Sequence, residues 1–126
     1  MTDLIFYAVL ALFIAHELDA VKRQEWKVLP IFRDFPPQIG FYLFIVGHIP
    51  LLIVFFWLMG HPSPLIRTWF QIGLDSFAIV HTILHWLFQK HEHYDFNTSF
   101  SKWLIYLTSI MAIIHLLALN GFGQLA

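Results

Sequence analysis

The sequence contains no cysteine and few charged residues. The absence of cysteine excludes disulfides, thiolate nucleophiles and thiolate metal ligands, so imidazole and carboxylate groups are the ligands that the chain can offer to a metal. Only 12% of the 126 residues are charged and the formal net charge is -1, so there is no extended basic surface and nucleic acid is not expected as a partner. Because 59% of the residues are hydrophobic, the chain has too little polar surface for a soluble domain of this size. The composition indicates a membrane protein whose unusual feature is its eight histidines.

Four apolar segments are long enough to cross the hydrocarbon core of a bilayer. They predict an all-α fold, an integral membrane four-helix bundle that forms a single transmembrane domain over residues 1–126. The first segment has no basic region before it and no small-residue cleavage site after it, so we expect a retained span rather than a signal peptide. The expected spans are residues 4–20, 38–59, 65–89 and 100–120.

Lysine and arginine are concentrated in two of the three expected loops. Short loops rich in these residues stay on the cytoplasmic side of a membrane. The first and third loops are therefore expected to be cytoplasmic and both termini outside, with the lipid bilayer as the main partner. The first loop contains Lys22, Arg23, Lys27 and Arg33, the third contains Lys90 and Lys102, and the second has only Arg67 near its end.

The third segment combines the length of a span with a polar stripe. On a helix of 3.6 residues per turn, Asp75, Thr82 and His85 fall on one stripe, and His81 lies at its edge. Ionisable groups at membrane depth are costly, so they normally face the interior of a bundle and mark functional sites. We therefore expect this stripe to face the other helices.

The expected depths of the histidines and acids place them in two polar layers. His81 and His85 are four residues apart, a spacing that lets two imidazoles of one helix share an ion. His16 and Asp19 are three residues apart, close to the spacing by which bundle helices supply ligands to carboxylate-bridged metal centres. Histidine and carboxylate ligands without sulfur suit a divalent metal, Zn or Fe. The expected metal ligands are His16, Asp19, His48, His81 and His85, and the second layer consists of Asp75 and His115, again within reach of His48.

Simpler interpretations exist for several of these residues. A single histidine within a span commonly forms a hydrogen bond between helices, which would account for His48 or His115 taken alone. Asp19 has Lys22 and Arg23 about one turn on, so an ion pair at the membrane interface is the alternative to a ligand role. The paired spacing at residues 81 and 85 is the part of the pattern that favours metal or proton chemistry.

The motif HELDA at residues 16–20, followed by Glu25 and Trp26, resembles a group of small bacterial integral membrane proteins of the HxxEE type. Asp19 and Ala20 stand where the name of that group has two glutamates. The resemblance covers the four-span layout and a few motif residues. It implies a site in the bacterial inner membrane made of histidine and acid side chains, and it implies no particular reaction.

Three functions are compatible with these patterns. The first is a membrane enzyme in which a divalent metal activates water or oxygen against a lipid-soluble substrate. The second is a small proton-coupled transporter, since Glu17 invites comparison with small multidrug transporters, although helical phase turns this side chain away from the histidine face. The third is an accessory subunit of a larger membrane complex. A homo-oligomer is compatible with each of them.

Overall fold

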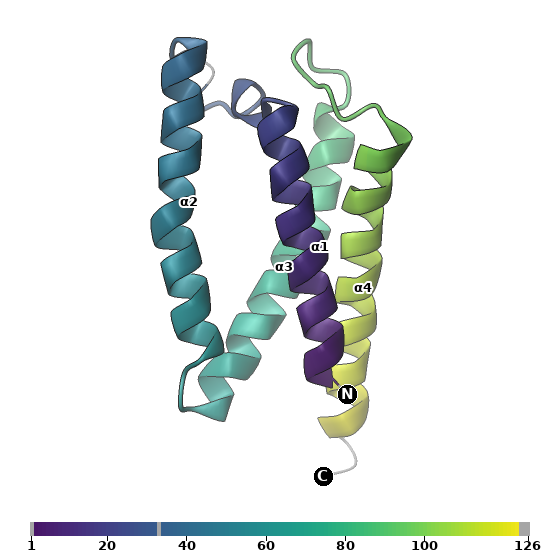
Figure 1. Ribbon diagram of the computed structural model, residues 1–126. Coiled ribbons are helices and arrows are strands. Elements are labelled where there is room, and N and C mark those ends of the chain that lie inside the picture. The colour runs from purple at the N-terminus through teal and green to yellow at the C-terminus, as the bar shows by residue number, and fades with distance from the viewer. Residues whose placement is uncertain (1, 33, 124–126) are drawn as a thin grey trace.

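The computed structural model describes residues 2–32 and 34–123, with side chains described up to residue 120. It is all-α with four long helices, as the sequence predicts (Figure 1). Each helix begins and ends within three residues of the expected segment. Arg33, one of the basic residues counted in the first loop, lies outside the described residues. The elements are α1 (Thr2–Lys22), the short 3-10 helix η1 (Glu25–Lys27), α2 (Pro37–Met59), α3 (Pro64–Phe88) and α4 (Ser99–Gly123).

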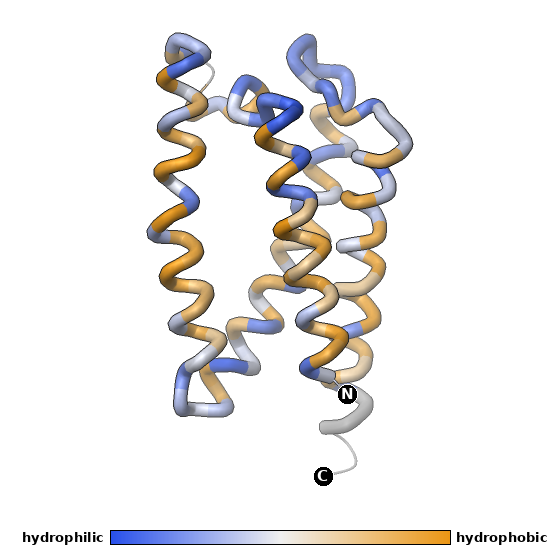
Figure 2. The backbone as a smooth tube through the Cα atoms, viewed as in Figure 1, coloured by the Kyte–Doolittle hydropathy of each residue, from blue (hydrophilic) through white to orange (hydrophobic). Residues whose placement is uncertain are grey.

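Within the described chain, three helices are long and apolar enough to cross a membrane, which indicates an integral membrane protein. They are α1, α2 and the Ser99–Asn120 part of α4. The hydrophobic residues form a broad middle zone and the hydrophilic ones gather towards the loops at its two ends (Figure 2). The exception is α3, whose polar stripe and Arg67 make it less apolar than its neighbours. Its 25 residues correspond to about 37 Å at 1.5 Å per residue, so it has the length of a span, and its crossing stays a prediction.

Small side chains allow three of the helices to pack closely. α1 packs most extensively on α4, and α4 packs on α3. Val9, Ala78 and Ala112 form a buried cluster where these helices meet. Small residues at such positions let helix backbones approach, which is how membrane helices associate without a hydrophobic driving force between them. α1, α3 and α4 therefore form the compact part of the bundle.

The second helix stands apart from this group (Figure 1). α2 contacts η1 near its own beginning and α3 near its end, while most of its side chains are exposed. The helix starts with Pro37 in its first turn, where the missing N–H costs nothing, and α3 starts in the same way with Pro64. A cavity of about 680 Å³ lies between α1, α2 and α3. Its wall consists mainly of phenylalanine and leucine side chains.

Candidate metal centre

A short irregular segment after α1 brings Glu25 back over the end of that helix. Gln24 has φ 56 and ψ 45, in the left-handed region, and this reversal of direction separates α1 from η1. Trp26, the next residue after Glu25, is buried and packs on Phe44 of α2. A Cβ atom on Gly40 would lie 2.8 Å from Cδ1 of this indole, so glycine is required for the close approach of α2. The packed tryptophan fixes the position of the glutamate beside it.

Three histidine nitrogens converge where α1 and α3 pack together. Nε2 of His16 lies 2.9 Å from Nε2 of His81 and 3.2 Å from Nε2 of His85. The two α3 nitrogens are 3.1 Å apart, as their spacing of four residues allows. His16 and His85 are buried and His81 is only partly exposed. The predicted meeting of imidazoles from two helices is present in the structure.

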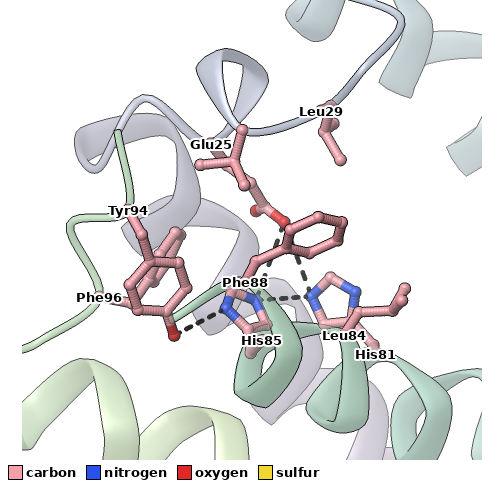
Figure 3. Close-up of a pocket in the computed structure, with 9 residues that line it drawn as sticks. Glu25, Leu29, His81, Leu84, His85, Phe88, Tyr94 and Phe96 are labelled. Atoms are coloured by element: carbon pink, nitrogen blue, oxygen red, sulfur yellow. Dashed lines mark hydrogen bonds and ion pairs between the residues drawn. The ribbon is translucent and has the colours of Figure 1, made fainter. Parts of the chain in front are cut away.

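Glu25 completes this group from the side of the loop. Its Oε1 atom lies 3.9 Å from Nε2 of His81 and 3.8 Å from Nε2 of His85. One ligand atom from each of the four residues lies within 4.8 Å of the other three, so the group could hold a metal ion. The close-up view shows the carboxyl group pointing at the two α3 imidazoles (Figure 3). We refer to His16, Glu25, His81 and His85 as the histidine–glutamate cluster.

Hydrogen bonds alone cannot satisfy the three converging nitrogens. A ring nitrogen is a donor when it carries a proton and an acceptor when it does not. Among three nitrogens in mutual contact, at least two must therefore both be donors or both be acceptors. Those two face each other and cannot form a hydrogen bond. A metal ion removes this conflict because it accepts a lone pair from each. At a Zn–N bond length of about 2.0–2.1 Å, tetrahedral ligand nitrogens lie about 3.3 Å apart, close to the observed separations.

Aromatic side chains and a tyrosine hydroxyl surround the cluster. The ring of Phe96 lies 4.6 Å from the His85 ring and 5.6 Å from the His16 ring, measured between centroids. The Nδ1 atom of His85 is 3.2 Å from the Tyr94 hydroxyl oxygen. The hydroxyl oxygen can accept from an Nδ1–H group, and in that tautomer Nε2 keeps a lone pair for a metal ion, in the way that second partners orient metal-binding histidines. Burial, with smaller contributions from Tyr106 and Glu25, raises the pKa of Tyr94 to about 12, so it remains a neutral hydroxyl.

The electrostatic setting of Glu25 is also unusual. Burial, reinforced by the charge of Glu17, raises the pKa of the Glu25 carboxyl to about 8. Near pH 7 the carboxyl therefore holds a proton unless a cation replaces it. A divalent ion at the cluster would supply that positive charge.

The structure does not bring Asp19 into the cluster. Its Oδ1 atom accepts from Nε of Arg23 at 3.3 Å, one helical turn on, which is the interfacial ion pair that the sequence offered as the alternative. Arg23 also reaches Asp95 and Thr98 in the loop before α4. Through Arg23, the aspartate therefore links the end of α1 to that loop. The expectation that it is a metal ligand is not supported by its position.

His48 likewise lies outside the cluster, because it has a different acid as its partner. Its Nε2 atom is 3.0 Å from Oε2 of Glu17, and its Nδ1 atom donates to the backbone oxygen of Phe44 at 2.6 Å. Glu17 lies outside the cluster, as its helical phase predicts, and it contacts α2, which supplies His48. The two side chains form a bridge between α1 and α2.

The second layer is a pair rather than a trio. Oδ2 of Asp75 lies 2.6 Å from Nδ1 of His115, and both side chains are fully buried between α3 and α4. His48 is absent from this layer because it is engaged by Glu17 on the other side of α1. The Asp75–His115 pair therefore links α3 to α4 without reaching the histidine–glutamate cluster.

The fold and the site together define a helical membrane protein with a buried group of three histidines and one glutamate that could hold a metal ion. The chain belongs to DUF6713, a family of unknown function, whose family model matches residues 2–122. Comparisons with curated proteins and with solved structures found no match.

Proposed function

We propose that the protein binds a divalent metal ion, Zn or Fe, at the histidine–glutamate cluster and acts as a metal-dependent membrane enzyme on a lipid-soluble substrate. The observation that carries the proposal is the convergence of three histidine Nε2 atoms with a carboxylate oxygen beside them. Imidazole and carboxylate ligands suit zinc and iron and require no sulfur. A bound ion of this kind lowers the pKa of a water molecule to about 7.

Two cavities of different size adjoin the cluster. A small one of about 50 Å³ is lined by Glu25, His81, His85 and Tyr94, and it exceeds the space of about 10–15 Å³ that one water molecule requires. The apolar cavity of about 680 Å³ is also lined by Glu25 and His81. Both cavities therefore border Glu25 and His81 of the cluster. This arrangement supports hydrolysis or oxidation of a substrate that enters from the bilayer.

The location of the site follows from the proposed topology. α1 begins and α4 ends at the same end of the bundle (Figure 1), which agrees with an even number of crossings and with α3 as a span. The loop that carries Glu25 and the loop between α3 and α4 lie at the other end. Because these loops hold most of the lysines and arginines, we place the cluster in the cytoplasmic half of a bacterial inner membrane with both termini outside.

Proton-coupled transport is the second candidate function, and the Glu17–His48 bridge favours it. The pair lies on the wall of the large cavity and joins two helices that otherwise touch little. A proton exchanged on this pair could accompany movement of a substrate through the cavity. In a transporter, Glu17→Gln would abolish proton-driven substrate uptake into liposomes, and the metal content would not matter. In the enzyme, the same variant keeps its metal.

Metal analysis of the detergent-purified protein tests the proposed function. We expect one transition metal ion per chain in the wild type after purification without chelators. His85→Ala should lose it, whereas His93→Ala, a change to an exposed loop histidine, should keep it. A wild-type protein that contains no transition metal, and takes up neither zinc nor iron near neutral pH, would refute the proposal.

A further inference from the structure

The large cavity has the size and composition of a small-molecule site. Its volume of about 680 Å³ lies within the range of about 300–1,000 Å³ typical of ligand pockets. Away from the cluster its wall is made of apolar side chains, such as Phe55, Leu58 and Phe70. The rings of Phe55 and Phe70 pack edge to face, 5.4 Å apart, and join α2 to α3 at that end. A molecule in the cavity would therefore have an apolar part there.

The polar side chains of the cavity are few and belong to two neighbouring groups. Glu25 and His81 are members of the histidine–glutamate cluster, and Glu17 and His48 form the bridge between α1 and α2. Glu17 and Glu25 line the same cavity, so the two groups border one space. The cavity thus offers hydrogen-bonding groups at one end and hydrocarbon at the other.

The bridge leaves one carboxyl oxygen of Glu17 that can accept a hydrogen bond. A backbone carbonyl can only accept, so Nδ1 of His48 must donate to the oxygen of Phe44. The contact between Nε2 of His48 and Oε2 of Glu17 then requires one further proton, carried by either atom. A pair that shares one proton has no net charge when the imidazole and the carboxyl are counted together. Its remaining carboxyl oxygen can accept from a hydroxyl group.

Two glycines keep the cavity open. Gly47 on α2 and Gly73 on α3 both line it, and a Cβ atom built on either would meet no atom within 4 Å. Glycine within a helix costs about 1 kcal/mol relative to alanine, and neither position needs glycine to avoid a clash. Larger side chains at these positions would project into free space without displacing neighbouring atoms at the Cβ. The two positions therefore provide a way to fill the cavity without changing a metal ligand.

We propose that this cavity binds an uncharged amphipathic molecule that has one long hydrocarbon part and one hydroxyl group. The hydrocarbon lies among the phenylalanine and leucine side chains, and the polar group lies at the Glu17–His48 bridge beside the cluster. Among the residues that the structure describes, no lysine or arginine lines the cavity to pair with an anion, and a charge in an apolar site is costly. The inference rests on the proposed function, in that the ion would act on this bound group.

Photolabelling in lipid nanodiscs tests the proposal. The probes are a long-chain fatty alcohol that carries a diazirine and a phospholipid that carries a diazirine on one acyl chain. We expect the alcohol to label cavity residues, and unlabelled alcohol to displace it. Gly73→Phe should reduce this labelling by at least about tenfold. Val80→Phe, an exposed position on the same helix outside the cavity, should leave it unchanged, and Gly47→Leu repeats the test from α2.

The outcomes separate this inference from the proposed function, because metal content is measured on the same samples. Labelled cavity residues in a protein without metal would refute the metal centre and leave the pocket standing. Bound metal without labelling in the cavity would refute the pocket alone. Labelling that persists in both glycine variants, or a phospholipid probe that labels the cavity and is not displaced by the alcohol, would also overturn the pocket.

Discussion

Replacing Glu25 with glutamine should remove the metal ion while the fold stays intact. Glutamine has the shape of glutamate and lacks its charge, so the packing of the neighbouring Trp26 should be kept. The carboxyl is the one acidic member of the cluster, with Oε1 3.8 Å and 3.9 Å from two of the histidine nitrogens. Asp19→Asn is the matched control, because Asp19 is also buried and acidic but pairs with Arg23.

The loss of metal affinity in Glu25→Gln can be measured as a loss of the stability that the bound ion gives to the folded protein. Loss of a group that merely orients a ligand lowers metal affinity by about 10–100-fold, so loss of a ligand should lower it by at least about 100-fold. An ion present at 100 times its dissociation constant stabilises the folded protein by about 2.7 kcal/mol. After a 100-fold loss of affinity, the same ion concentration contributes only about 0.4 kcal/mol. Most of the metal-dependent increase in Tm should therefore disappear.

The assay is thermal unfolding in detergent with and without added zinc, together with metal analysis. We expect the zinc-dependent rise in Tm for the wild type and for Asp19→Asn, and a much smaller rise for Glu25→Gln. If Asp19→Asn loses the ion and Glu25→Gln keeps it, the ligand set deduced from the geometry is wrong and the one expected from the sequence is right.

Zinc uptake should also release protons, with a pH dependence set by Glu25. Its pKa of about 8 means that the carboxyl is protonated near pH 7 before the ion binds. Affinity should therefore rise with pH up to about 8, and this contribution should level off above it. Calorimetry in buffers of different ionisation enthalpy measures the released protons, and an unchanged proton count in Glu25→Gln would contradict this assignment.

Three further predictions concern the fold. Asp75→Leu should lower stability by about 1–3 kcal/mol more than Asp75→Asn, because asparagine still accepts from the buried histidine partner; equal Tm values would contradict the pairing. Gly40→Ala should lower Tm because its methyl group meets the indole ring, with an overpacking cost of about 1–3 kcal/mol, whereas Gly47→Ala should not. A cysteine at Ser63 should react with an impermeant reagent added outside, and one at Glu92 should not; the reverse pattern would invert the topology.

The helices could be predicted from the sequence because each is a long apolar segment bounded by proline, glycine or charge. Pro37 and Pro64 mark the beginnings of α2 and α3, and the boundaries differ from expectation by no more than three residues. The positions of the helices relative to one another could not be predicted. Helical periodicity shows which side chains share a face and does not show which neighbour that face meets. This is why periodicity could turn Glu17 away from the histidine face but could not identify His48 of α2 as its partner.

The candidate site was predictable where it depends on spacing within a helix. His81 and His85 share a face of α3 at a spacing of four residues, and His16 meets them as expected. Glu25 was missed as a ligand because it lies in a loop, where the direction of the chain depends on the left-handed conformation of Gln24. The sequence pattern that could have indicated Glu25 is its position next to Trp26. A large apolar side chain of this kind tends to be buried, and its burial brings the neighbouring acid towards the protein interior.

The histidine–glutamate cluster can form only late in the synthesis of the chain. His16 and His81 are separated by 65 residues along the chain. At a translation rate of about 5–20 residues per second, roughly 3–13 s pass between the synthesis of His16 and the synthesis of its first partner on α3, His81. During this interval α1 and α2 are present without the imidazoles that complete the cluster. Under the proposed function, metal loading would follow the insertion of α3, so any cellular factor that delivers the ion should act on the finished protein rather than on the nascent chain.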